Sequence, residues 1–257
     1  MAPRVETRIE DRAAGRIAHV TVCNAAKLNI LASPTIQALT EAMAALAGDA
    51  ALRAAVLRGE GSRAFIGGAD INEMATLDAA RGRTFITALH GACAAIRALP
   101  VPVVARMQGY TLGAGLEIAA ACDLRVASVG AKMGMPEVRI GIPSVIEAAL
   151  LPPLIGWGRT RRLLLTGETI DAPTALAWGL VEEVVAEDAL DAAIARLLTD
   201  ILACGPNAIR QQKRLMAEWE ELSPAGAIAR GIDCFAEAWA TPEPAERMAA
   251  FLAAKRR

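Results

Sequence analysis

Histidine and aromatic residues are scarce in this sequence, and their scarcity excludes several kinds of functional site. The 257 residues include two histidines, His19 and His90, which stand alone in the sequence. Zinc sites of the HExxH kind and Ser-His-Asp triads therefore lack their parts, and we interpret both histidines as packing residues. The chain has four Trp, one Tyr and four Phe. These are too few for the aromatic platforms on which a glycosidase would hold a sugar, although carboxylate pairs are present.

Two common catalytic loops are also missing. No GxSxG or GxxxxGK[ST] motif occurs, which excludes the usual α/β-hydrolase and P-loop sites. The segment Gly113-Ala114-Gly115-Leu116-Glu117-Ile118 begins like a dinucleotide fingerprint. Ile118 stands where the third small residue of GxGxxG belongs, so the pattern does not favour a nicotinamide or flavin cofactor.

The sequence has no excess of charge and no long apolar run. Lys and Arg total 27 and Asp and Glu total 28, so no basic field would attract nucleic acid or an anionic membrane. The apolar runs end before the length needed to span a bilayer. The five cysteines are odd in number and widely spaced, and residues 1–11 do not have the pattern of a secretory signal,. We therefore expect a soluble cytoplasmic protein without disulfides.

Strand-like and helix-like segments alternate over the first two thirds of the chain. Alternating or continuous β-branched and apolar residues predict strands over 15–23, 54–57, 101–107 and 124–127,. Apolar residues that recur three and four positions apart predict helices over 35–47, 77–98 and 114–121,. This order predicts an α/β fold.

After about residue 188 the pattern becomes helical only. One amphipathic helix ends at the Gly205-Pro206 pair, and three further helices are expected to start near Asn207, Pro224 and Pro242. We predict a core over residues 1–190 and a helical C-terminal region over residues 191–257. A helical region with so much apolar surface should pack on the core or on another subunit.

Two glycine-containing segments follow strand-like runs, namely residues 65–74 and 109–117. Small residues let a ligand approach the backbone, and the second segment opens a helix whose free N–H groups favour negative charge. Two such N–H groups directed at one oxygen would form an oxyanion hole. The alternative is that both are ordinary strand-to-helix turns.

Glu117 and Glu137 are carboxylates in apolar surroundings. Glu117 lies in the apolar helix 114–121, and Glu137 follows Met133-Gly134-Met135-Pro136. Burial and a nearby like charge both raise the pKa of a carboxyl group toward the range useful for proton transfer at neutral pH. They are candidate acid/base residues, although either could also be a surface or capping glutamate.

Taken together, these segments resemble the enoyl-CoA hydratase/isomerase (crotonase) family, and the similarity extends from Ile17 to Lys255. The segments that carry it are residues 64–74, 105–117, 134–137, 163–167 and 172–185. The resemblance implies a crotonase-like spiral of ββα turns with a helical C-terminal oligomerisation region, in a homotrimer or homohexamer. It also implies an acyl-CoA thioester substrate, with no metal or redox cofactor.

The resemblance also implies roles for individual residues. The N–H groups of Ala69 and Ala114 would bind the thioester oxygen and stabilise an enolate. Glu117 and Glu137 would be the catalytic pair of a hydratase, with Glu117 activating water and Glu137 protonating C2 of a 2-enoyl-CoA. The implied substrate-binding residues are Lys27, Leu28, Gly68, Ala69, Asp70, Ile71, Ala114, Phe251 and Lys255, of which the last two would complete a neighbouring subunit's CoA site.

One segment departs from the family pattern. After Glu137 a glycine-rich stretch is typical, but residues 141–152 read Gly-Ile-Pro-Ser-Val-Ile-Glu-Ala-Ala-Leu-Leu-Pro. We expect a reshaped acyl pocket, and Glu147 adds a third carboxyl group that we interpret as a helix-surface residue rather than a substrate-facing one. The departure leaves open a double-bond isomerase, another acyl-CoA lyase or hydrolase, and a non-catalytic CoA-binding subunit.

Overall fold

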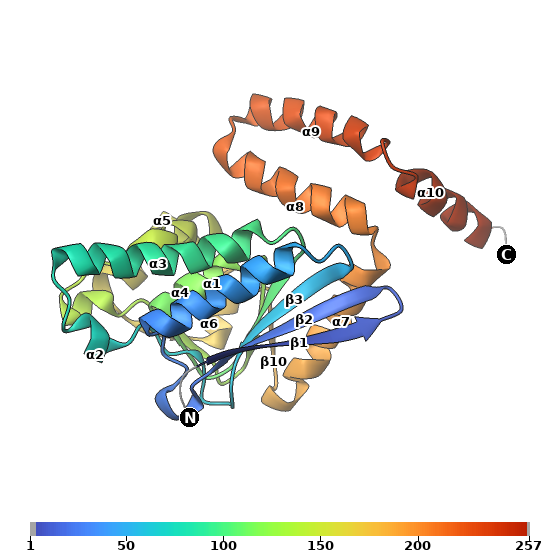
Figure 1. Ribbon diagram of the computed structural model, residues 1–257. Coiled ribbons are helices and arrows are strands. Elements are labelled where there is room, and N and C mark those ends of the chain that lie inside the picture. The colour runs from blue at the N-terminus through green and yellow to red at the C-terminus, as the bar shows by residue number, and fades with distance from the viewer. Residues whose placement is uncertain (1–3, 256–257) are drawn as a thin grey trace.

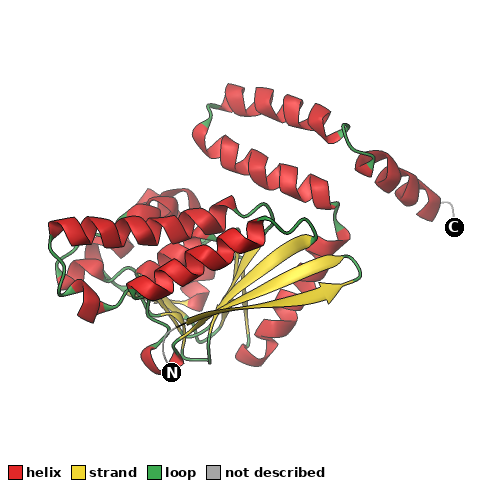
Figure 2. Ribbon diagram, in the orientation of Figure 1, coloured by secondary structure: helices red, strands yellow, loops and turns green. Residues whose placement is uncertain are grey.

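The computed structural model describes residues 4–255, and two β-sheets organise its fold (Figures 1 and 2). The first three residues of the predicted core (1–3) and the last two of the predicted C-terminal region (256–257) lie outside the described residues. The larger sheet has the order β1 (Arg4–Arg12), β2 (Gly15–Cys23), β3 (Leu52–Gly59), β5 (Val103–Met107), β7 (Leu124–Ser128) and β10 (Glu183–Val185). The smaller has the order β4 (Ala64–Ile66), β6 (Tyr110–Leu112), β8 (Lys132–Gly134) and β9 (Thr169–Asp171).

Three successive turns of the chain each give one strand to each sheet. Strands β3, β5 and β7 pair in parallel in the larger sheet, and β4, β6 and β8, which follow them, pair in parallel in the smaller sheet. The helices α2 (Ile71–Met74) and α3 (Ala79–Ala98) follow β4, and α4 (Ala114–Ala121) follows β6. This arrangement confirms the predicted spiral of ββα turns.

Helices cover both faces of the larger sheet (Figure 1). On one face, α1 (Ser33–Ala47) and α3 pack in the main core, which includes Ile36, Leu39 and Leu89. On the other face, α7 (Leu190–Ala203) buries Ile194 and Leu198 against side chains of the sheet. Helix α7 therefore belongs by sequence to the predicted C-terminal region, which begins at residue 191, but it packs on the sheet of the core.

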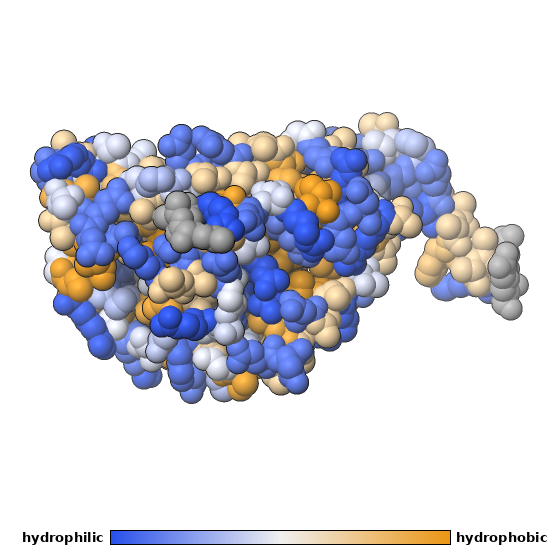
Figure 3. All heavy atoms as spheres, turned by 60° about the horizontal axis from the view of Figure 1, so that its bottom comes forward, coloured by the Kyte–Doolittle hydropathy of each residue, from blue (hydrophilic) through white to orange (hydrophobic). Residues whose placement is uncertain are grey.

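The C-terminal helices α8 (Pro206–Glu221), α9 (Pro224–Ala238) and α10 (Glu243–Ala254) extend from the body as an arm (Figures 1 and 3). Large hydrophobic side chains are exposed along the arm, including Ile228, Ile232, Phe235, Trp239, Met248, Phe251 and Leu252. Among residues 4–255, no single helix is long and apolar enough to cross a membrane. One pair of helices, Glu187–Ala203 with Pro206–Glu221, has the length and composition of a membrane span, but the two are bent by 104° relative to each other.

Strand β1 and the four short strands of the smaller sheet were not predicted. In β1, Arg and Glu occupy one face and Val5, Thr7 and Ile9 the other, but neither face is buried, and the strand is held by antiparallel pairing with β2. Each strand of the smaller sheet has three residues, too few to show a period of two. The remaining helices are η1 (Ala25–Lys27), η2 (Glu137–Ile140), η3 (Ile146–Leu150), α5 (Leu151–Thr166), α6 (Ala172–Trp178) and η4 (Glu187–Ala189).

Candidate active site

The chain segments that leave β4, β6 and β8 meet at one end of the smaller sheet. Because these strands are parallel neighbours, their carboxyl ends lie at the same edge, where ligands bind in many α/β sheets. A cavity of about 610 Å³ opens there, and its lining includes Gly68, Ala69, Ala114, Glu117 and Glu137. The fold thus brings together the predicted oxyanion segments and both predicted glutamates.

The N–H groups of Ala69 and Ala114 are free to bind a ligand. The N–H of Leu31 donates to the Gly68 carbonyl at 2.8 Å, and that of Asp70 donates to the Leu31 carbonyl at 2.8 Å. In this parallel bridge the Ala69 N–H faces away from Leu31. Ala114 is the first residue of α4, where an N–H has no partner inside the helix,. Within residues 4–255, neither N–H donates a hydrogen bond to the protein.

The predicted CoA segment lies against the first oxyanion segment. The Leu28 carbonyl accepts a hydrogen bond from the Gly67 N–H at 2.8 Å, and Leu28 has a left-handed φ of 58°. Lys27 is exposed at the end of η1. The tightly turned backbone at Leu28 therefore contacts the residue before Gly68, and Lys27 precedes it in the chain.

Helix α4 places Glu117 in the cavity wall. All eight residues of this helix are buried, and Glu117 is 4% exposed. The helix packs closely on β4 because residue 115 is glycine: a Cβ there would lie 2.1 Å from the Ile66 carbonyl oxygen. Gly115 therefore fixes how near Glu117 lies to the oxyanion segments.

Burial raises the pKa of Glu117 to about 8, with the negative charge of Glu137 as the next cause and that of Glu147 as a smaller one. Hydrogen bonds from the backbone of Ala148 and Val145 oppose the rise. A carboxyl group whose pKa lies near neutrality exchanges protons readily at physiological pH.

Glu137 is held from two sides. It begins η2, and its Oε2 accepts a hydrogen bond from the Ser144 hydroxyl at 2.7 Å. On the other side is Gly113, which has a φ of 52° and whose absent Cβ would lie 2.2 Å from Glu137 Oε1. Any larger residue at position 113 would therefore displace the carboxyl group of Glu137.

Gly113→Ala should therefore impair catalysis. The methyl group would displace the Glu137 carboxyl, so we expect kcat to fall by about 10- to 100-fold, as small misplacements at an active site do. The positive φ should also lower the free energy of unfolding by about 1 kcal/mol. Steady-state kinetics and urea unfolding measure these effects. Gly130→Ala is the matched control, because nothing lies within 4 Å of its Cβ position, and a fully active Gly113→Ala would contradict this role.

The other predicted substrate-binding residues lie in different surroundings. Ile71 lines the cavity, but Asp70 caps α2, and its Oδ1 accepts a hydrogen bond from the Asn72 N–H at 2.9 Å. Phe251 and Lys255 are exposed at the end of the arm, away from α2 and α4 (Figure 1), where Lys255 lies 4.6 Å from the Phe251 ring. Within one subunit, this tail does not reach the cavity.

One interpretation of the sequence was wrong, since Glu147 is 6% exposed and not a helix-surface residue. The exposed side chain of His90 contacts its carboxyl. The Nδ1 atom of His90 lies 2.8 Å from Glu147 Oε1. The pairing joins α3 to η3 across 57 positions, so no local pattern could show it. Ser144 was also missed as a partner of Glu137.

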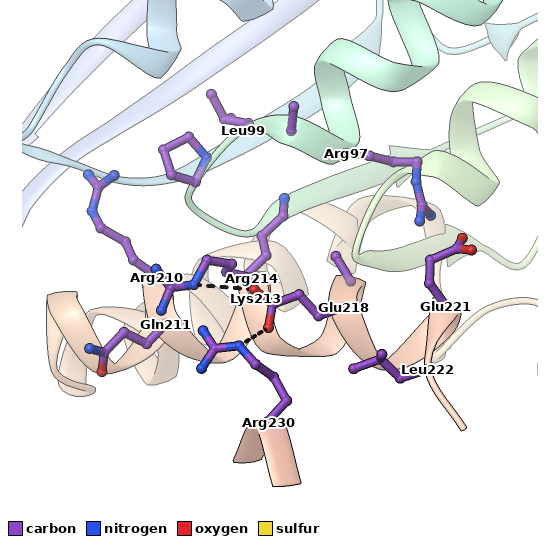
Figure 4. A pocket seen from close by; sticks show the side chains of 13 residues that line it. Arg97, Leu99, Arg210, Gln211, Lys213, Arg214, Glu218, Glu221, Leu222 and Arg230 are labelled. Carbon is purple, nitrogen blue, oxygen red and sulfur yellow. Dashed lines mark ion pairs between the residues drawn. The ribbon is translucent and has the colours of Figure 1, made fainter. Parts of the chain in front are cut away.

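A larger cavity, about 950 Å³, lies between α8 and the end of α3 but holds no comparable acid/base pair (Figure 4). Its cations already have partners: Arg230 pairs with Glu218 at 2.6 Å, and Lys213 with Asp123 at 2.6 Å. Separately, among residues 4–255 no group of three or more His, Cys, Asp or Glu side chains could hold a metal ion. The chemistry of the smaller cavity therefore distinguishes it as the candidate active site.

Known proteins resemble this chain over most of its length. The sequence profile of the family described as enoyl-CoA hydratase/isomerase matches residues 12–256. The chain is 32% identical over 239 residues to the short-chain-enoyl-CoA hydratase of Clostridium acetobutylicum, covering 93% of this chain and 92% of that protein. It is 34% identical over 226 residues to the crotonyl-CoA hydratase of Syntrophomonas wolfei, covering 88% and 87%.

Solved structures share the fold. An enoyl-CoA hydratase from Mycobacterium smegmatis superimposes with a TM-score of 0.91 at 30% identity, covering 96% of this chain and 95% of that one. An enoyl-CoA hydratase from Bacillus anthracis gives a TM-score of 0.90 at 27% identity, covering 95% of each chain.

Proposed function

The chain belongs to the enoyl-CoA hydratase/isomerase family, and we propose from this premise that it adds water across the 2,3 double bond of a 2-enoyl-CoA, or reverses that reaction. The family assignment confirms the resemblance inferred from the motifs. The observation that carries the proposed activity is the convergence of Glu117, Glu137 and the free N–H groups of Ala69 and Ala114 on one cavity.

The reaction needs each of these groups. The thioester oxygen binds between the Ala69 and Ala114 N–H groups, which stabilise the negative charge that develops on it. Glu117 accepts a proton from water while the water oxygen bonds to C3. Glu137 delivers a proton to C2, so the double bond becomes a single bond and a 3-hydroxyacyl-CoA results. A tightly coupled pair can exchange these two roles.

The pair of carboxyl groups favours hydration over the alternatives. A double-bond isomerase can shift a proton with one carboxyl group, whereas water addition uses a base and an acid. A CoA-binding subunit without activity would have no evident use for Glu117, whose burial is unfavourable for its charged form,. No metal or redox carrier takes part in the proposed steps.

We propose short 2-enoyl chains as substrates, because the relatives quoted above are named for short-chain-enoyl-CoA and crotonyl-CoA. The lining of the cavity includes the apolar side chains of Phe85, Ile86 and Leu89 from α3. The test is the loss of enoyl-thioester absorbance with a series of 2-enoyl-CoA substrates. Fast loss with the four-carbon substrate is expected, and no loss with any chain length would refute the proposal.

For CoA, we propose that Lys27 and Leu28 contact the nucleotide end, since both lie beside the first oxyanion segment. Phe251 and Lys255 would complete the same site in a neighbouring subunit. A cytoplasmic location is also proposed, as free cysteines suit a reducing compartment and all five are free,.

The arm is proposed to form a homotrimer, alone or paired into a hexamer. Helix α9 packs against α8, yet Ile232 and Phe235 on α9 are 67% and 69% exposed. Large apolar side chains exposed together in this way are typical of an interaction surface. The double variant Ile232→Asp/Phe235→Asp should therefore reduce the mass measured by analytical ultracentrifugation toward that of the monomer. Asp233→Asn, at an exposed position on the same helix, should leave the mass unchanged. A wild-type protein that sediments as a monomer would refute this proposal.

A further inference from the structure

The buried carboxyl of Glu147 lies next to the catalytic pair but outside the lining of the cavity. Its Oε1 is 2.8 Å from His90 Nδ1, while its Oε2 is buried and has no hydrogen-bond partner within residues 4–255. Burying a carboxyl group with an unsatisfied oxygen is destabilising. A side chain that destabilises the fold in this way calls for a functional explanation.

The backbone beside Glu147 is strained. Ile146, directly before it, has a φ of 40°. Left-handed backbone is rare for a β-branched residue, because its side chain clashes with the neighbouring peptide. Such conformations persist only where the surrounding structure enforces them, and they gather at functional sites. Something must therefore hold this segment in place.

The same short segment contacts both catalytic glutamates. The Ser144 hydroxyl donates to Glu137 at 2.7 Å. The backbone of Val145 and Ala148 lies close enough to the carboxyl of Glu117 to lower its pKa, and η3 packs against α4. Residues 144–148 thus form a cradle that orients the two acid/base groups relative to each other, and a shift of the cradle would move both.

The pair with His90 ties this cradle to the long helix α3. Helix α3 packs against both α4 and η3, and it contributes Phe85, Ile86 and Leu89 to the lining of the cavity. The His90 side chain is 56% exposed, while that of Glu147 is 7% exposed. The contact therefore joins an exposed side chain on α3 to a buried side chain of the cradle.

We propose that Glu147 is a positioning residue for hydration: its hydrogen bond to His90 fixes the strained cradle 144–148, so that Glu117 and Glu137 keep their reactive orientation. The inference rests on the proposed function and adds to it a residue that does not touch the substrate. It also explains why a glutamate occupies a position where glycine-rich sequence is typical.

The charge of Glu147 has a second effect. The titratable groups that face this region are His90 and Cys93 from α3, Glu117 from α4 and Glu137 from η2. The negative charge of Glu147 disfavours the ionised form of Glu117 and contributes to its raised pKa. Removing that charge should let Glu117 ionise at lower pH.

The experiment compares two substitutions at position 147 in the full-length protein. With crotonyl-CoA, we expect Glu147→Ala to lower kcat by about 10- to 100-fold with little change in KM, because orientation and not binding is lost. Glu147→Gln keeps a hydrogen bond to His90 and should recover most of kcat, while the acidic limb of its kcat/KM profile moves to lower pH. A purely structural role would not produce that shift.

The matched control is Glu10→Gln, which removes the charge from the other His–Glu pair, with His19 at 2.7 Å, far from the cavity on β1. It should leave kcat and the pH profile unchanged. Wild-type kcat in Glu147→Ala, or an unshifted acidic limb in Glu147→Gln, would overturn the proposal.

Two further measurements keep the test decisive. If Glu147→Ala does not fold, His90→Ala, at a half-exposed position, takes its place: a fall in kcat that His90→Gln restores supports the proposal, and wild-type kcat overturns it. Carboxyl ¹³C NMR titration of Glu117 needs no turnover. A lower pKa of Glu117 in Glu147→Gln is expected and an unchanged one counts against the proposal, even if the wild-type protein hydrates none of the substrates.

Discussion

Glu117→Gln should reduce the hydration of crotonyl-CoA by about 10²- to 10⁴-fold in kcat, the usual contribution of a general acid or base. Glutamine has nearly the shape of the glutamate and should fit the same buried position. It cannot take a proton from water. Because binding of the thioester does not depend on this proton transfer, KM should change much less than kcat.

The same substitution should stabilise the fold at high pH. The pKa of Glu117 is raised from 4.5 to about 8 in the folded chain. Folding is therefore not penalised by Glu117 below about pH 4.5, and the penalty grows as the pH rises from there through 8,. Glu117→Gln removes the penalty, so its free energy of unfolding at pH 8.5 should exceed the wild-type value by an amount on the order of 3 to 5 kcal/mol.

Urea unfolding at pH 4.5 and pH 8.5, at one protein concentration, measures this difference. The stabilisation should be small at the lower pH and large at the higher one. Glu41→Gln, which changes an exposed glutamate on α1, should alter neither activity nor the pH dependence. Equal stability of wild-type protein and Glu117→Gln at pH 8.5 would contradict the raised pKa of Glu117.

Ala114→Pro should remove one oxyanion donor and leave the fold intact. Proline fits the first position of a helix, where its missing N–H has no helical partner, and Ala114 is the first residue of α4. The preceding Gly113 has φ 52° and ψ −121°, the mirror image of the extended backbone that precedes proline and one that glycine adopts freely. We expect kcat to fall by about 10²- to 10³-fold.

Ala114→Gly is the matched variant, because it keeps the N–H and changes only the methyl group. It should retain most of the activity, and the melting temperature of Ala114→Pro should stay within a few degrees of wild type. If Ala114→Pro folds and is as active as Ala114→Gly, the N–H of residue 114 is not an oxyanion donor.

The site was predictable where it depends on local sequence. Ala69 and Ala114 follow strands and lie in glycine-containing turns, and parallel strands bring such turns together. Glu117 could be singled out because a charged residue stands in an otherwise apolar helix. In each case the informative residues stand within about ten positions of one another, so the pattern and the family resemblance were sufficient to predict these residues of the cavity lining.

The support for the site was not predictable in the same way. The contact between His90 and Glu147 and that between Ser144 and Glu137 depend on how η2 and η3 fold back after β8. The positive φ of Ile146 has no signal in the sequence, since isoleucine normally avoids that conformation. Tertiary packing decided these positions.

The fold shows the same division. The strand at Gly15–Cys23 and the helix at Ala114–Ala121 have the bounds that their sequences predicted. Strand β1 carries its Arg and Glu residues on one face and Val5, Thr7 and Ile9 on the other, and it pairs with β2 along its whole length. Edge strands with many charges resist aggregation. The alternation of these charges with Val5, Thr7 and Ile9 was present in the sequence, and this strand was missed.

The most direct test of the proposed chemistry is a single assay of enoyl-thioester absorbance with crotonyl-CoA, run on the wild-type protein, Glu117→Gln and Glu137→Gln. We predict that the wild-type protein consumes the absorbance and forms 3-hydroxybutyryl-CoA, and that each variant is slower by about 100-fold or more. A wild-type protein that leaves crotonyl-CoA unchanged, or a variant that matches the wild-type rate, would contradict the two-glutamate hydratase.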